Sequence, residues 1–462
     1  MMIQKLIRRS YWHIISKFLS NRAFRPGLVL LGLLVPLLVS AQEKPSFARI
    51  DSLSYQAYLK SDWKKVIEYS RDGLTAGYDY YYLRVRAGIA ELNLKNPNKA
   101  AVHFRKALDF SLNDPVALEY LYSSLLFSGN LAEARLLAGT YSPAFRKRLG
   151  IPSNRLITNA FIEFGYMVNP KVGELKAIRP DAELAYVYLL PDYWYLAAGV
   201  SLEAGRRFSG SLSTNILSFK PIQQFLIQNQ AAQVFDVPFD QRAVHLSGSY
   251  YLGKGFHMGL AGQYMSYTVP LYTRIAGETG DTYYLEALDY RDLALNASVT
   301  KRFSHLTLTI AADANRFKNL WYKQAMARAT FYPSGNINTY LTAEATLITD
   351  SLNPSGRIIA HGSAGRRLFR SIWLEGDYYY GDICNFSEQS AYVVFNNLDL
   401  IRKRMGISLL AFRVLPHLDL SIRYQYTLRT ASWRIYRNSE YISDLKNDYP
   451  VHNFIGGLIW RF

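Results

Sequence analysis

His245, Ser247 and Ser249 come closest, in type and spacing, to a catalytic arrangement. A serine hydrolase needs a serine, a histidine and a carboxylate in one constellation, and serine and histidine are common enough for this neighbourhood to indicate chance. The histidines after residue 41 are scattered singly, without the spacing of metal ligands. Neither a phosphate-binding Gly-rich loop nor a Gly-x-Ser-x-Gly elbow occurs. We therefore predict no enzyme, no catalytic residue, no cofactor and no metal site.

Charged residues of both signs alternate with apolar ones in the C-terminal two thirds of the chain. Those predicted to face inward from β-strands are Asp313, Arg328, Glu344, Glu375, Asp377, Asp419, Arg423 and Arg429. One interpretation is a polar conduit whose charges tune selectivity. The other is a set of structural salt bridges between neighbouring strands, because arginine and carboxylates pair readily. No ring of a single sign emerges that would name an ion or a sugar.

The elements that position these charges are strands, because a period of two begins near Leu156. Apolar residues alternate with polar ones over 306–315 and 418–429, and the same dyad recurs at 256–266, 293–299 and 337–347. One face is apolar enough for lipid and the other is polar. A soluble sandwich also alternates, but its strands usually have about 5–6 residues. These segments have the length of tilted transmembrane strands.

Turn composition predicts the topology of a barrel. Short connections at 252–255, 301–304, 332–335 and 414–417 suit periplasmic hairpins, and long polar ones at 220–240, 269–287, 382–403 and 430–450 suit the outside. We count about fifteen strands after Leu156. A bacterial single-chain barrel has an even number, so the expectation is 14 or 16, with the least certain assignments at 156–187 and 391–395. A barrel of that size can enclose a polar conduit.

The C-terminal strand carries an aromatic signature. Phe454, Gly456, Leu458, Trp460 and Phe462 share one face and end the chain. The segment resembles the assembly signal of Gram-negative outer-membrane β-barrels, with matches at Gly457, Trp460 and Phe462, although Ile455 stands where a polar residue is usual. The resemblance implies outer-membrane lipid and the barrel-assembly machinery as partners. A soluble edge strand that ends in phenylalanine is the alternative.

The N-terminus indicates export. Six basic residues without an acid (Lys5, Arg8, Arg9, Lys17, Arg22 and Arg25) precede an apolar run, 27–39. A small-residue cleavage site, 39–41, comes before Gln42, which is typical of a secretory signal peptide. The run is shorter than the roughly 20 residues that span a bilayer, which disfavours an uncleaved anchor.

The net charge of +17 comes without a nucleic-acid-binding motif, so it suits anionic lipid or polysaccharide better than nucleic acid. The lone Cys384 forms no disulfide within the chain, and we expect it in a loop as a free thiol or an incidental residue.

Between the signal peptide and the strands lies a helical pattern that repeats every 34 residues. Val66, Ala100 and Ala134 keep this interval, and so do Trp63, Pro97 and Leu131. The copy at 81–114 resembles the tetratricopeptide family best, since its small and aromatic packing positions are Gly88, Ala100, Phe104 and Ala107. The resemblance implies three helix pairs stacked as a solenoid.

A tetratricopeptide solenoid binds partners along a concave groove. The positions that match the family's groove are Asp51, Tyr55, Tyr58, Tyr82, Asn93, Glu119 and Ser123. The lysine and asparagine of a chaperone-type carboxylate clamp are missing there. The set therefore predicts a partner surface without an assignable ligand, and the alternative is a spacer that packs against the barrel mouth.

The sequence thus predicts an α+β multidomain chain: a signal peptide (1–41), a periplasmic tetratricopeptide-like domain (42–150) and an antiparallel transmembrane barrel of 14–16 strands (151–462). The architecture is similar to that of tetratricopeptide-containing exopolysaccharide exporters of the outer membrane. That resemblance implies a transport, export or secretion component whose repeats gather a partner, or a polysaccharide or protein cargo, at the periplasmic mouth. A non-conducting structural or assembly subunit of an envelope complex is the alternative.

Overall fold

The computed structural model describes residues 45–151, 155–236, 238–275, 277, 280–351, 354–392 and 400–462. The chain divides into two compact units, Met1–Asp79 and Tyr80–Phe462. The predicted signal peptide lies outside the described residues, and the predicted boundary between residues 150 and 151 stays a prediction. No helix in the described part of the chain is long and apolar enough to cross a membrane.

The first unit contains the helices α3 (Phe47–Leu59) and α4 (Trp63–Thr75). Each begins at a side-chain cap: Ser46 Oγ accepts from the N–H of Arg49 at 3.3 Å, and Asp62 Oδ1 accepts from the N–H of Lys65 at 3.3 Å. Val66 of α4 is buried in the core of this unit.

The second unit begins with the helices α5 (Tyr81–Asn93), α6 (Pro97–Phe110), α7 (Pro115–Phe127), α8 (Leu131–Ala138) and α9 (Pro143–Arg148). A Cβ on Gly88 would lie 2.7 Å from the Phe104 ring, so glycine allows this close helix contact. The Tyr141 hydroxyl donates to the Leu118 carbonyl at 2.7 Å, and burial raises the pKa of Tyr141. The helices agree with the predicted helical pattern, whereas a tetratricopeptide solenoid stays a prediction.

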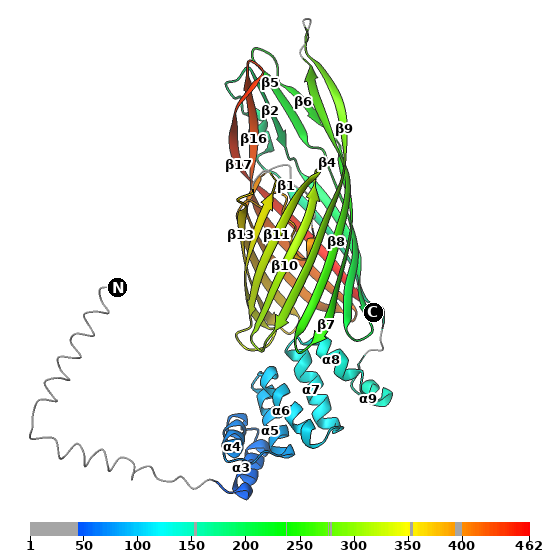
Figure 1. Cartoon of the computed structure of the whole chain (residues 1–462), viewed down its shortest axis with the longest axis vertical. Helices are drawn as coiled ribbons and strands as arrows, with labels where there is room; N and C mark the ends of the chain where they lie inside the picture. The colour runs from blue at the N-terminus through cyan, green and yellow to red at the C-terminus, as the bar shows by residue number, and fades with distance from the viewer. Residues whose placement is uncertain are drawn as a thin grey trace, which may run out of the picture. The chain divides into compact units, whose positions relative to one another are not determined.

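The rest of the second unit is a closed antiparallel barrel of 14 strands (Figure 1). Its strands are β1 (Ile157–Val168), β3 (Tyr193–Ala204), β4 (Phe208–Phe219), β7 (Phe239–Gly253), β8 (Phe256–Ile275), β9 (Thr282–Arg302), β10 (Leu306–Phe317), β11 (Leu320–Phe331), β12 (Thr339–Asp350), β13 (Arg357–Phe369), β14 (Ile372–Tyr380), β15 (Leu400–Leu415), β16 (Leu418–Arg437) and β17 (Glu440–Arg461). The last strand pairs with the first, with Leu458 opposite Ile162. This seam closes the hydrogen-bond ladder.

The outer face of the barrel is apolar. Leu260, Ile310 and Ile358 are 69%, 64% and 68% exposed, while the residues next to them on each strand point inward. A belt of this kind around a closed barrel is too large for a surface in water and suits the hydrocarbon core of a bilayer. The barrel is therefore a membrane-spanning one, as the dyad pattern predicts.

Three strands lie outside the barrel wall: β2 (Leu184–Leu189), β5 (Ile222–Ile227) and β6 (Gln233–Asp236). They form a small sheet in the order β2, β5, β6. The sheet joins the barrel where Tyr186 of β2 pairs with Arg434 of β16. This sheet has a core of its own around Trp433 and Tyr449, beside the short helix α10 (Val172–Ala177). These strands alternate like wall strands, so sequence alone does not separate them from the wall. The 14 strands of the wall confirm the lower of the two expected totals, 14 and 16.

The prediction of long loops at 269–287 and 430–450 is wrong. The paired strands continue through both, and β16 and β17 are joined only by Asn438 and Ser439. Cross-strand pairing persists there, for example with Leu271 opposite Glu286. In both extensions successive residues are exposed, as at 284–287 and 440–446, so the alternation between an apolar outward row and a polar inward row that marks a wall strand disappears. The predicted short turns all lie at the opposite end, which we call the short-turn end; the other is the long-loop end.

The predicted assembly signal lies on the closing seam. The N–H of Phe462 donates to the Thr158 carbonyl at 3.1 Å, and the Trp460 and Phe462 side chains are 47% and 51% exposed on the outer face. Replacing both by alanine removes apolar contact with lipid, and we expect most of the chain to stay unassembled. Heat-modifiable migration in gels of outer-membrane fractions measures this.

The matched control replaces Tyr441 and Ile442, exposed apolar residues (56% each) on the extension of the same strand, by alanine. Normal assembly of the Trp460→Ala/Phe462→Ala variant would contradict the assembly role.

Candidate functional site in the barrel lumen

The segment Gly381–Tyr392, which we call the inner loop, folds into the barrel after β14. The N–H of Ser387 donates to Gln324 Oε1 at 3.0 Å, and the Ser387 hydroxyl accepts from Asn315 Nδ2 at 2.9 Å. Gln324 and Asn315 are buried, inward-facing residues of β11 and β10. The prediction that 382–403 is an outside loop is therefore wrong for this part, because wall side chains satisfy the loop's backbone inside the lumen.

The inner loop crosses the lumen from one wall to the other. Glu388 forms an ion pair with Arg404 of β15, and the Ser390 carbonyl lies 2.8 Å from His245 Nε2 of β7. Five wall strands separate β15 from β7 in one direction and seven in the other, so these contacts lie on nearly opposite walls. The loop is thus held at both ends of its span.

The start of the inner loop is fixed to β13 and β11. Arg357 donates to the carbonyls of Asp382 (2.9 Å) and Cys384, and Asn385 donates to the Tyr322 hydroxyl at 2.9 Å. The two bonds from Arg357 are charge-assisted, and all three are partly buried. Cys384 lies in a loop, as expected, although this loop is inside the barrel.

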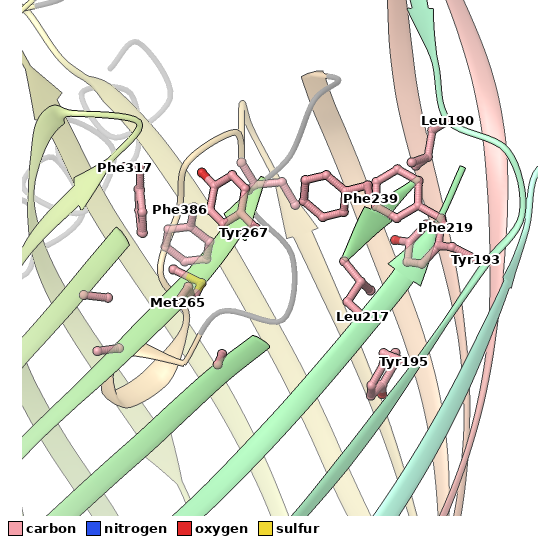
Figure 2. Packing of buried hydrophobic residues seen from close by; sticks show 14 of the residues in the cluster. Leu190, Tyr193, Tyr195, Leu217, Phe219, Phe239, Met265, Tyr267, Phe317 and Phe386 are labelled. Atoms are coloured by element: carbon pink, nitrogen blue, oxygen red, sulfur yellow. The ribbon is translucent and has the colours of Figure 1, made fainter. Parts of the chain in front are cut away.

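An aromatic cluster occupies the lumen toward the long-loop end (Figure 2). Phe219 ends β4 and Phe239 begins β7, and their rings are 4.7 Å apart. Phe386 of the inner loop is buried in the same cluster, 6.1 Å from the ring of Tyr379. The inner loop and these rings together form an apolar layer across the barrel.

Two polar cavities lie on the other side of the inner loop, with volumes of about 500 and 630 Å³. Serine and threonine hydroxyls of β4, β7 and β9 line the first, which also touches Ser390. Tyrosines, arginines and carboxylates line the second, together with Glu388 and Tyr392 of the inner loop. Arg328 borders both cavities, so they meet beside it. Cavities of this size suit small polar solutes.

The structure brings four of the predicted inward charges together in the second cavity: Arg328, Glu375, Asp377 and Arg423. Arg328 Nε donates to Glu344 Oε2 at 2.6 Å across adjacent strands, and Glu375 accepts from the Tyr340 hydroxyl.

The other predicted charges lie elsewhere. Asp313 accepts from Asn296 and Gln324, Asp419 accepts from Arg461, and Arg429 donates to the Tyr193 hydroxyl at 3.3 Å. Arg328–Glu344 and Asp419–Arg461 are ion pairs, whereas Asp313 and Arg429 bond neutral side chains. Both interpretations of the charges, selectivity and structural salt bridges, stay predictions.

The sequence analysis did not predict Glu163, a charged residue at the seam where β1 pairs with β17. Glu163 of β1 accepts from the Tyr195 hydroxyl at 2.7 Å and from Arg423 of β16 at 3.2 Å. Gly457 of β17 lies between them, and a Cβ there would stand 2.5 Å from Ser421 Oγ and 3.8 Å from Glu163 Oε2. Glycine leaves room for the pair to cross the closing strand. Glu163 was missed because the first strand was located least well. Glu388 was missed because it falls in the presumed loop, and Arg404 because it comes directly after that loop.

The predicted groove residues are distributed over both units: Asp51, Tyr55 and Tyr58 on α3, Tyr82 and Asn93 on α5, and Glu119 and Ser123 on α7. Tyr55 and Tyr82 are 48% and 64% exposed. Tyr58 packs edge-on against Trp63, Asn93 donates to the Ile89 carbonyl, and Glu119 pairs with Arg148 at 3.3 Å. A shared groove stays a prediction.

Helices of the second unit contact the short-turn end of the barrel. Asn98 of α6 donates to the Ser304 carbonyl at 2.6 Å, and Asn336 donates to the Lys95 carbonyl at 3.3 Å. Arg135 of α8 forms an ion pair with Glu203 at 2.7 Å. A third cavity, of about 360 Å³, lies between α8 and the ends of β7 and β9.

The described residues contain no group of three or more His, Cys, Asp or Glu that could hold a metal ion.

No protein-family model and no curated protein matches this chain. Among solved structures, it is similar to a Pseudomonas aeruginosa FadL homologue at 10% identity and a TM-score of 0.42, over 66% of this chain and 90% of that one. The Pseudomonas putida toluene transporter TodX matches at 10% identity and 0.43, over 71% and 94%. Acinetobacter baumannii Omp33 matches at 7% and 0.31, over 66% and 99%.

The lone cysteine offers a probe of the inner loop. We expect Arg357→Ala to remove the bonds that hold the loop's first residues and to raise the rate at which a methanethiosulfonate reagent labels Cys384 several-fold. The control is Arg366→Ala, which alters an exposed, outward-facing arginine on the same strand. Equal labelling rates in the Arg357→Ala variant and the native protein would show that these bonds do not hold the loop.

Proposed function

We propose that the chain is an outer-membrane transport barrel of a Gram-negative bacterium, in which the inner loop gates a polar pathway for a small solute or a single polysaccharide chain. The position of the inner loop inside the barrel is the observation that supports this proposal. The loop spans a wide barrel between opposite walls and separates an aromatic layer from two polar cavities.

The chemistry of the lumen supports transport over simple anchoring. An anchor needs only an apolar outer face, and its interior can be filled by side chains that pack. Here the interior keeps two cavities, although buried polar groups cost free energy unless each is hydrogen-bonded. The loop's anchors are polar pairs, such as Glu388 with Arg404, which water or a polar solute can replace. Cavities of about 500 and 630 Å³ are too small for a folded protein cargo.

We propose further that the helices act on the periplasmic side. The helix starts support tetratricopeptide repeats, since α3, α5 and α7 begin at residues 47, 81 and 115, which are 34 residues apart. The contact between Gly88 and Phe104 joins a small and an aromatic packing position of that family. The contacts of α6 and α8 with the short-turn end would place a bound partner or cargo beside the lumen.

The gate is tested by removing it. Deleting residues 385–390 from the inner loop should raise the single-channel conductance in planar bilayers several-fold, because the span between β15 and β7 is lost. The control deletes 437–440 at the tip of the β16–β17 hairpin, which lies outside the wall. If both variants form barrels that do not conduct, the conduit hypothesis is wrong. The alternative, a non-conducting subunit of an envelope complex, then explains the protein better.

The partner surface is tested on the exposed tyrosines. Replacing Tyr55 and Tyr82 by alanine should remove the partner that crosslinks to the native protein in the periplasm, because aromatic side chains supply most contact area at such surfaces. The control is Leu112→Ala, since Leu112 is 77% exposed and lies outside the predicted groove. Undiminished crosslinking of the tyrosine variant would contradict the partner surface and favour the alternative, in which the helices are a spacer.

A further inference from the structure

An apolar groove runs along the outer wall of the barrel over β7–β10, with a volume of about 720 Å³. Its floor consists of outward-facing small residues such as Gly262, Ala297 and Ala312, and Leu246, Leu260 and Leu295 form its sides. A Cβ on Gly262 would lie 3.2 Å from Leu295 Cδ2, so a larger residue there would narrow the groove. The volume lies within the roughly 300–1,000 Å³ of ordinary ligand pockets.

A cluster of cations, which we call the basic row, lies on the same wall along the long-loop end of the groove, where Lys323 is paired with the groove residue Ala314. Its members are Arg242 of β7, Arg291 of β9, Arg316 of β10 and Lys323 of β11, all exposed and outward-facing. Ser266 of β8 pairs with both Arg242 and Arg291, which puts these two arginines on one line across the three strands.

The basic row lacks carboxylate partners. No ion pair joins any of the four cations to a carboxylate of the described residues, and Arg316 bonds only a neutral group, Asn319 Oδ1, at 3.0 Å. The nearest outward acids, Asp240 and Asp289, lie one residue pair farther along the strands, and Asp289 accepts from Thr268. Exposed cations without partners favour an anionic ligand.

Aromatic residues mark the membrane interface at the level of the basic row. Tyr264 and Trp321 are 46% and 51% exposed, and Trp321 is paired with Arg316 across the β10–β11 hairpin. Amphipathic rings gather at the level of lipid headgroups. The groove therefore lies at the level of acyl chains, and the basic row lies at the level of headgroup phosphates.

We propose that this wall binds a phosphorylated glycolipid of the outer leaflet, of the lipid A type, with an acyl chain in the groove and its phosphates on the basic row. The choice of leaflet rests on the orientation in the proposed function. Arg242 and Lys323 are four strand spacings apart, roughly 19 Å across the strands at about 4.8 Å each, and they are also offset along the strands, so their separation exceeds the reach of one phosphate. A headgroup with two phosphates on a disaccharide fits this width better than a phospholipid with one. Arginine binds phosphate by charge-assisted, bidentate bonds.

The test measures the binding of purified lipid A, phosphatidylglycerol and phosphatidylcholine to the full-length barrel in detergent, by native mass spectrometry and by the shift in melting temperature. The native protein should bind lipid A most tightly. A variant with Arg242, Arg291, Arg316 and Lys323 all replaced by glutamine should bind it at least about tenfold more weakly. Ala297→Leu/Ala312→Leu should also weaken binding, because leucine fills the groove while the basic row stays intact.

Two controls match these variants. Arg437→Gln/Lys446→Gln removes exposed cations from the β16–β17 extension, and Ala343→Leu/Ala345→Leu enlarges outward small residues of β12 outside the groove. Both should bind lipid A like the native protein. Equal binding of lipid A by the native protein and the glutamine variant, or a preference for phosphatidylglycerol or phosphatidylcholine, would overturn the proposal. Neither variant alters the lumen. A negative result in the conductance test would therefore leave the lipid-binding result unchanged.

Discussion

The closing seam between β1 and β17 is the contact on which the rest of the barrel depends. A bilayer offers no water to backbone groups, so an open sheet edge at this level would leave a row of unsatisfied donors and acceptors. Pairing of Ile162 with Leu458 removes that edge. The inner side of the seam carries the Glu163–Arg423 ion pair, for which Gly457 leaves room. The same closure separates an apolar outer face from a polar lumen, and so creates both candidate sites.

Much of the barrel could be predicted from sequence, because the bilayer imposes a period of two on every wall strand. The segment 306–315 shows the pattern plainly, with Leu308 and Ile310 outward and Asp313 inward. Where lipid no longer touches the strands, the signal disappears, as in the β8–β9 and β16–β17 extensions. The three strands of the small outer sheet alternate for a different reason, since they bury one face on Trp433 and Tyr449.

The inner loop could not be predicted, because its position comes from long-range polar contacts that have no local period. Glu388 and Ser390 are separated by one residue, yet they contact opposite walls. Composition gave the same polar, turn-rich appearance that a surface loop has. The inward charges of the wall were predictable as a set, but their partners were not. Arg328 with Glu344 follows from strand register, whereas Arg423 with Glu163 requires knowledge that the barrel closes on its first strand.

The central claim is that the inner loop closes the lumen, and locking the loop tests it most directly. In a Cys384→Ser background, Ser387→Cys and Asn315→Cys place thiols at two groups in hydrogen-bond contact, 2.9 Å apart, on the loop and the wall. A short, reducible bifunctional thiol reagent then joins them. Solute flux into proteoliposomes should be lost when the bridge forms and should return after reduction. Equal flux in the bridged and reduced states would contradict the account.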